Sequence, residues 1–149
     1  MILERTEHPS WLSNAYLLGD KPGGHGVLVD SNGIDQPLIE AAVRHGLTIT
    51  HVLVTHHHPD HVVTCAEDAR RFGVKVLAHA LAREAGVEVD EPIADGDTIR
   101  SGDLEIEVVA TPGHCRDHLA FLVNGMPNAW YVQHLCALDT CGELGHERG

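Results

Sequence analysis

A strand-like run that leads directly into a histidine cluster constrains this chain more than any other feature of its sequence. Residues His51-Val-Leu-Val-Thr55 are mostly apolar and β-branched, which is typical of a strand buried on both faces of a sheet. The chain continues as His56-His-His-Pro-Asp-His61, with four imidazoles and one carboxylate in six positions. These side chains suit zinc or iron, and the carboxyl ends of strands are where open α/β sheets bind ligands. The sequence therefore predicts a metal site at the end of a buried strand.

The spacing within the cluster divides its side chains between different sides of the backbone. The following proline excludes helical geometry at His58, so we expect a shaped loop in which His56 and His58 face one ion. Asp60 and His61 then fall on another side, as a second ion would require. His57 alternates away from its neighbours and is expected in solvent or in support of the ligands. The alternative interpretation is a histidine-rich surface loop that binds nothing.

A second segment adds a further imidazole. Thr111-Pro-Gly-His114 follows another predicted strand, and its Pro-Gly pair forces a turn that can bring His114 back over the sheet. With His56 and His58 this residue would complete a three-histidine set and leave one position open for water, as in catalytic zinc sites. Without the first cluster, His114 would be interpreted as an ordinary turn histidine.

Composition restricts the class of protein. The 149 residues suit one compact domain, and the formal net charge of −12 argues against nucleic acid as a partner. No apolar run approaches the roughly 20 residues of a membrane helix, and the acidic start Met1-Ile-Leu-Glu-Arg does not resemble a secretory signal. We therefore expect a cytoplasmic protein with no membrane partner. The four cysteines form no C-x-x-C pair and are expected to be reduced.

The order of predicted elements indicates the fold class. Asp35 and Thr64 are the predicted helix N-caps, the second within a Thr64-x-x-Glu67 capping box. Strands alternate with helices in the first half and cluster in the second, which predicts a layered α/β domain with mixed sheets and helices outside. Strands are expected at 14–18, 26–30, 51–55, 74–78, 104–110 and 119–123, with a hairpin turn at 101–103, and helices at 35–46, 64–72 and 80–85.

Two motifs carry a resemblance to a known family. Residues 55–61, Thr-His-His-His-Pro-Asp-His, match the H-x-H-x-D-H signature of the metallo-β-lactamase superfamily, and Thr111-Pro-Gly-His114 with the later His118 is similar to its next motif. The resemblance is strongest over 15–125, and the single-domain hydrolases similar to hydroxyacylglutathione hydrolase look nearest. It implies an αββα sandwich with mixed sheets and helices outside.

The resemblance also implies roles for the candidate ligands. His56, His58 and His114 would hold a first metal, and Asp60 and His61 would hold a second. His118 would support the ligands or be structural.

The last part of the chain departs from the family pattern. The family expects a bridging aspartate and a final metal-binding histidine, for which this chain offers Asp139 and either His134 or His146, in poorly matching surroundings. We interpret 1–149 as a single domain in which 126–149 is atypical and the second half of the sandwich is incomplete. The chain is then either a divergent short relative or a truncated product. In the second case exposed apolar surface would favour a homodimer or poor solubility.

The expected function is hydrolysis of a thioester, ester or amide bond in a small molecule by a zinc-activated hydroxide. Asp60 would orient that hydroxide or bind the second ion, so one or two Zn²⁺ ions per chain are expected. No G-x-S-x-G motif offers a serine nucleophile instead. The identity of the substrate is not predicted.

Two alternatives stay open. Because the superfamily includes persulfide dioxygenases, Fe²⁺ held by His56, His114 and Asp139 would resemble their mononuclear site. The other alternative is a metal-binding module whose catalysis has lapsed. Four further residues are expected to be ordinary, with His79 in packing or on the surface, Cys115 as a small buried side chain, and Arg116 and Asp117 in a solvated turn.

Overall fold

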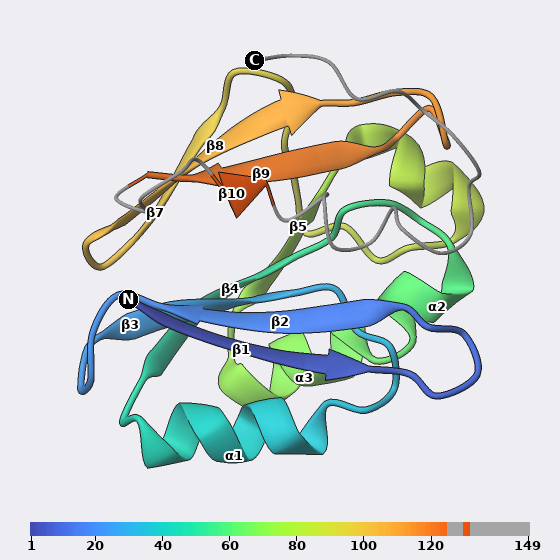
Figure 1. Cartoon of the computed structure of the whole chain (residues 1–149). Coiled ribbons are helices and arrows are strands. Elements are labelled where there is room, and N and C mark those ends of the chain that lie inside the picture. The colour runs from blue at the N-terminus through green and yellow to red at the C-terminus, as the bar shows by residue number, and fades with distance from the viewer. Residues whose placement is uncertain (125–129, 132–149) are drawn as a thin grey trace.

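Two facing β-sheets form the centre of the molecule, with helices on the outer side of the larger sheet (Figure 1). The computed structural model describes residues 1–124 and 130–131 of the chain. The strands are β1 (Ile2–Glu7), β2 (Asn14–Gly19), β3 (His25–Val29), β4 (Thr48–Leu53), β5 (Lys75–Ala78), β6 (Glu91–Pro92), β7 (Thr98–Ser101), β8 (Leu104–Ala110), β9 (Leu119–Val123) and β10 (Trp130–Tyr131). The helices are α1 (Gln36–Arg44), α2 (Pro59–Val62), α3 (Cys65–Phe72) and the 3-10 helix η1 (Ala80–Ala85).

The larger sheet is mixed, as the sequence predicted. Its strand order is β1-β2-β3-β4-β5-β6, in which β1, β2 and β3 pair antiparallel and β3 to β6 pair parallel. The parallel strands β3 and β4 therefore end at the same edge of the sheet. This edge carries the first histidine segment, because the chain leaves β4 directly into Val54, Thr55 and His56.

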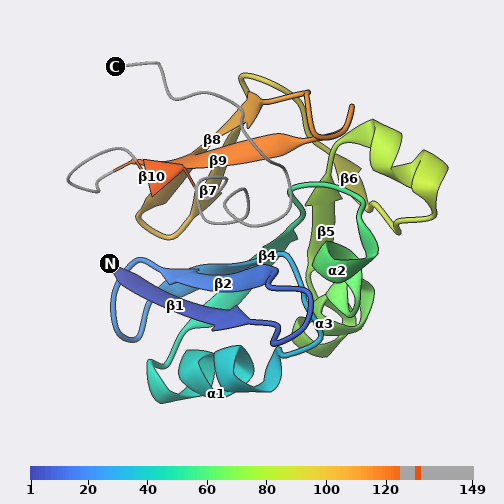
Figure 2. The same cartoon turned by 45° about the vertical axis from the view of Figure 1, so that its right-hand side comes forward.

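The smaller sheet has the order β10-β9-β8-β7, with all of its pairs antiparallel. The segment that contains His114 connects β8 to β9. Figure 2 shows this sheet lying across the larger one, with the β8–β9 connection on the same side of the molecule as α2. The two histidine segments thus come from different sheets and meet where the sheets face each other.

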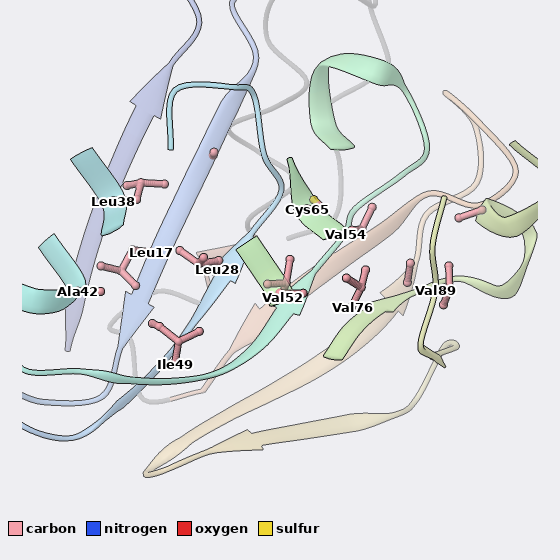
Figure 3. Close-up of a cluster of buried hydrophobic side chains, with 14 of the residues drawn as sticks. Leu17, Leu28, Leu38, Ala42, Ile49, Val52, Val54, Cys65, Val76 and Val89 are labelled. Carbon is pink, nitrogen blue, oxygen red and sulfur yellow. The ribbon is translucent and has the colours of Figure 1, made fainter. Parts of the chain in front are cut away.

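Alternation along the strands builds two apolar cores. Leu17, Leu28 and Val52 point to one face of the larger sheet and pack against Leu38 and Ala42 of α1 (Figure 3). The residues between them point to the other face and pack against the smaller sheet. That second core contains Tyr16, Leu18, Val27, Val29, Leu53, Leu77, Ile93, Ile99, Leu104, Ile106, Val108, Leu119, Phe121 and Val123. Each buried strand has apolar side chains on both faces because it is covered on both.

The helix starts differ from the predictions in one respect. Asp35 and Thr64 are the N-cap residues of α1 and α3, but neither side chain makes a capping hydrogen bond. The Thr64 hydroxyl instead contacts the carboxylates of Asp35 and Asp68, and Ser31 also donates to Asp35. These groups contact one another in a buried polar cluster, which removes them from capping, and Asp35 Oδ1 has no hydrogen-bond partner in the described residues. The predicted stop of α3 is confirmed, since Gly73 has a left-handed φ of 66°.

Four elements were not predicted, namely β1, α2 and the two-residue strands β6 and β10. Strand β1 alternates exposed and half-buried side chains at the edge of the sheet, so its pattern is weak. The histidine segment was expected to be a loop throughout, but Pro59–Val62 forms the short helix α2 with its proline in the first turn, where proline is tolerated. His58 itself is extended, with ψ 142°, as the following proline requires. No helix in the described residues has the length and apolarity needed to cross a bilayer.

Candidate metal centre

The two histidine segments are held together by backbone hydrogen bonds. The Leu119 N–H donates to the Thr55 carbonyl at 2.8 Å, which joins the start of β9 to the end of the first buried strand. The Thr111 N–H donates to the His118 carbonyl at 2.9 Å and closes the loop that carries His114. The loops that bear the predicted ligands are therefore fixed to each other by main chain as well as by side chains.

His56, His58 and His114 lie together, as the spacing predicted. Their ring centroids are 4.6–5.0 Å apart in pairs, and His114 Nε2 lies 2.9 Å from His58 Nδ1. One donor atom from each of these residues and from Cys115 lies within 4.8 Å of the others. His56 is buried while His114 is exposed, so the group extends from the interior of the protein to solvent.

The hydrogen bonds of His56 decide which of its nitrogens can bind a metal. The Thr55 hydroxyl has one proton, which it donates to Asp30 Oδ2 at 2.7 Å. The same oxygen therefore accepts from His56 Nδ1–H at 2.9 Å. The proton then sits on Nδ1, and Nε2 keeps its lone pair. His56 Nε2 is buried and has no hydrogen-bond partner in the described residues, which is the state expected of a ligand nitrogen before it meets a cation.

Burial and crowding keep these imidazoles neutral. Burial lowers the pKa of His56 far below its ordinary value, and the charges of the neighbouring imidazoles lower it further. Burial and then the facing His114 lower the pKa of His58, with a smaller opposing effect of Asp60. Metal ligation requires the neutral ring. His56 and His58 are therefore ready to bind a cation at neutral pH without first losing protons.

Asp30 organises the centre, although the sequence analysis gave it no role. Its buried carboxylate accepts from the Thr55 N–H at 2.7 Å, from the Thr55 hydroxyl, and from His61 Nδ1 at 2.8 Å. It follows β3 with a left-handed φ of 59°, a conformation that aspartate tolerates better than most residues. The signal for its role was the parallel arrangement of β3 and β4, because both strands end in polar residues at one edge.

His61 and Asp60 lie beside the three histidines. The ring centroid of His61 is 4.2 Å from that of His56, and His61 Nε2 is 3.5 Å from Asp60 Oδ2. Burial alone would lower the pKa of His61, but its hydrogen bond to Asp30 and the charges of Asp30 and Asp60 raise it above the ordinary value. Within the described residues, Asp60 and His61 belong to no group of three close donors. Asp139, His134 and His146 lie outside the described residues.

His118 supports the centre from behind. It is buried, its Nδ1 lies 2.8 Å from the Thr111 hydroxyl, and its ring centroid is 4.7 Å from that of His56. Burial lowers its pKa, although Asp30 acts in the opposite direction. His79, which was expected to be ordinary, accepts the Leu81 N–H at 3.1 Å and begins η1.

One prediction was wrong. Asp117 was expected in a solvated turn, but it is only 2% exposed, because its carboxylate is turned inward and lies 2.7 Å from His57 Nδ1. Burial would raise the pKa of Asp117, whereas the hydrogen bond and charge of His57 and the nearby Cys115 thiol lower it. Arg116 is exposed as predicted, and Cys115 is half-buried rather than fully buried. Arg116 and Asp117 also line a cavity of about 400 Å³ with Cys115, His57, Leu81, Glu84 and Ala85.

The residues present suit a metal ion. His56 Nε2 is buried without a partner in the described residues, the pKa values of His56 and His58 are lowered, and His56, His58 and His114 converge. Together these features describe a nitrogen-donor set that is open on one side. Three histidine ligands with an open position are the usual arrangement of catalytic rather than structural zinc sites.

Comparisons with known proteins agree with the geometry. A family model described as the metallo-beta-lactamase superfamily matches residues 9–126. A hydroxyacylglutathione hydrolase of Rhodopseudomonas palustris (strain BisA53) is 40% identical over 107 residues, covering 72% of this chain and 42% of the relative. One from Bradyrhizobium sp. (strain ORS 278) is 36% identical over 129 residues, covering 87% of this chain and 50% of the relative. The chain therefore spans about half the length of the curated relatives it matches.

Solved structures confirm the predicted fold class. A crystal structure of ETHE1 from Myxococcus xanthus superposes with a TM-score of 0.71 at 26% identity, covering 83% of this chain and 54% of the other. The BLEG-1 B3 metallo-beta-lactamase superposes with a TM-score of 0.67, covering 82% of this chain and 67% of the other, and at 21% identity it shows the fold alone. The layered arrangement of two facing sheets, of which the larger is mixed, is thus shared.

Proposed function

Because the chain belongs to the metallo-beta-lactamase superfamily, we propose that it is a metal-dependent hydrolase acting on a thioester of a small molecule. The observation that carries the proposal is the convergence of His56, His58 and His114 from two sheets, with the buried Nε2 of His56 lacking a partner among the residues that the structure describes. The matching relatives named hydroxyacylglutathione hydrolase support an acyl glutathione as the substrate class.

His56, His58 and His114 would hold one zinc ion. When bound there, zinc lowers the pKa of water towards about 7 and so supplies hydroxide as a nucleophile at neutral pH. The remaining chemistry belongs to the chain itself. Asp30 and Thr55 fix the tautomer of His56, so that Nε2 faces the open side of the group.

Asp60 is the residue placed to handle a proton. Its carboxylate is partly exposed and lies 3.5 Å from His61 Nε2, and the ring of His61 lies beside that of His56. We propose that Asp60 accepts the proton of the attacking water and orients its oxygen. The adjoining cavity of about 400 Å³ has the size of a small-molecule site, and it would receive the acyl group.

Turnover by the purified full-length chain tests the proposal. The zinc-loaded protein is expected to hydrolyse an S-acyl glutathione, and His58→Ala is expected to lower kcat/KM by at least about 100-fold. His45→Ala, which changes an imidazole paired with Glu4 away from the centre, should leave the rate unchanged. If the protein binds zinc stoichiometrically but turns over no thioester, ester or amide, the interpretation as a lapsed metal-binding module replaces this proposal.

The likeness to the ETHE1 structure supports a second candidate, an iron-dependent persulfide dioxygenase. The first proposal predicts zinc in the purified protein and thioester hydrolysis without oxygen. The second predicts iron, and oxygen uptake when glutathione persulfide is added. Elemental analysis together with an oxygen electrode separates the two.

A further inference from the structure

We propose that His57, Cys115 and Asp117 form a separate cation site beside the three-histidine group, suited to zinc or another borderline divalent ion. The three side chains bring the nitrogen, sulfur and oxygen donors that zinc accepts. They come from the same two loops as the histidine group. His57 lies between His56 and His58 in the sequence, and Cys115 and Asp117 follow His114. The proposal concerns binding and does not depend on turnover.

Geometry brings the three donors within reach of one ion. One donor atom from each side chain lies within 4.8 Å of the other two. Zinc bonds of about 2.0–2.3 Å place two donors of a tetrahedral ion roughly 3.3–3.8 Å apart. The 2.7 Å contact between His57 and Asp117 is shorter than this spacing, and the widest separation of up to 4.8 Å is longer, so the side chains would have to adjust by about 1 Å on binding.

Asp117 supplies an independent reason to expect a cation. One of its carboxylate oxygens contacts His57, but Oδ2 is buried and has no hydrogen-bond partner in the described residues. A buried carboxylate oxygen without a partner is costly, and an absent ion is a recognised explanation for such a group. A divalent cation would balance the Asp117 carboxylate and a Cys115 thiolate, with a ring nitrogen of His57 as the third ligand.

The site is accessible and distinct from the second site that the family resemblance implies. All three side chains line the cavity of about 400 Å³, and His57 keeps 31% of its side chain exposed, so an ion can enter from solvent. Asp60 and His61 are not among its members. Within the described residues, the His57 trio is the one further group of three donors besides the cluster around His56.

Cys115 could serve either group, since its sulfur also lies within 4.8 Å of the donor atoms of His56, His58 and His114. We assign Cys115 to the group with His57 and Asp117, because Asp117 Oδ2 is buried without a hydrogen-bond partner in the described residues. The three histidines already form a complete facial set, whereas His57 and Asp117 need a third ligand. The assignment of the thiolate is therefore the point that an experiment must decide.

Cobalt titration of the metal-free full-length chain makes the thiolate visible. A thiolate bound to Co²⁺ gives a charge-transfer band in the near ultraviolet that imidazole and carboxylate ligands do not give. We expect this band in the wild type and in His58→Ala, and its loss in Cys115→Ser. His57→Ala and Asp117→Asn should weaken the cobalt affinity measured from the band by at least about tenfold.

Controls keep the result specific to this site. A variant with Cys136→Ser and Cys141→Ser should retain the band, and circular dichroism should show that each variant is folded. The Asp117→Asn variant could fail to fold because Asp117 is buried. His57→Ala tests the same site at a partly exposed residue and therefore keeps the proposal testable. Absence of the band in the wild type would overturn the proposal, and so would a band lost in His58→Ala but kept in His57→Ala. Either result leaves the hydrolase proposal to be judged by turnover alone.

Discussion

At the scale of single residues, the centre depends on hydrogen bonds made by side chains that do not themselves face a ligand. The Thr55 hydroxyl lies between Asp30 Oδ2 and His56 Nδ1, at 2.7 Å and 2.9 Å. This chain of contacts holds the His56 ring in one tautomer and one orientation. Groups that hydrogen-bond to the ligands therefore contribute to the metal affinity.

Thr55→Val tests this role, because it removes the hydroxyl with little change of shape. His56 Nδ1–H would lose its acceptor, and Asp30 Oδ2 would lose one of its two donors while keeping His61, at a cost of about 1–3 kcal/mol in the free energy of unfolding. Zinc affinity should fall by about 10- to 100-fold. Calorimetric titration of the metal-free protein measures the affinity. Thr98→Val, at an exposed position of β7, is the control. Equal zinc affinities in the wild type, Thr55→Val and Thr98→Val would contradict the role given to Thr55.

The residues that bind could be predicted from the sequence more easily than the residues that support them. The histidine segments carry spacing and turn signals, and the structure brings His56, His58 and His114 together. Asp30 has no local signal, since its role arises from the parallel neighbour of its strand. Asp117 was misjudged because charged turn residues are usually exposed, and only the contact with His57 from the other loop explains its burial.

At the scale of elements, the strands and main helices followed from periodicity, while the helix starts did not. Asp35 and Thr64 have the residue types of N-caps, but their side chains join Asp68 in a buried cluster next to Ser31. A capping pattern describes only local geometry. Here α1 and α3 pack side by side on one sheet face, and the polar groups of both helix starts pair with each other.

This cluster predicts a pH dependence of stability. Burial, and then the charge of Asp35, raise the pKa of Asp68 to about 7. A raised carboxyl pKa means that the folded state binds the proton more tightly than the unfolded state. The resulting stabilisation is complete below the ordinary value near 4 and is lost as the pH rises through about 7. The slope for one such group is at most about 1.4 kcal/mol per pH unit.

Asp68→Asn keeps the shape and removes the titration. Urea unfolding of the wild type and the variant between about pH 5 and pH 8 should show a difference that moves in favour of the variant as the pH rises. The wild type and the variant carry the same histidines, so the contribution of histidine protonation to the pH dependence cancels in the difference between them. Glu67→Gln, an exposed neighbour on α3, should show no such trend. A difference independent of pH would refute the role assigned to Asp68.

At the scale of the whole molecule, the centre joins two sheets that also meet through an apolar core and a few hydrogen bonds, such as that from Thr50 to Ser101. His56 and His58 follow the larger sheet, whereas His114 belongs to the connection between β8 and β9 of the smaller one. An ion held by all three would therefore link the sheets. The unfolded chain lacks this arrangement of donors, so metal binding should stabilise the folded state.

Removal of metal tests this link. With zinc at about 100 times its dissociation constant, the expected stabilisation is about 2.7 kcal/mol, which corresponds to a rise in Tm of roughly 5–15 °C for a domain of this size. Thermal unfolding with added zinc and with a chelator measures the difference. His114→Ala should abolish most of it, because the smaller sheet then contributes no imidazole to the group, and His45→Ala should preserve it. If His114→Ala kept the full zinc-induced rise, the ion would be bound by the larger sheet alone, and the two sheets would be joined by their apolar core without help from metal.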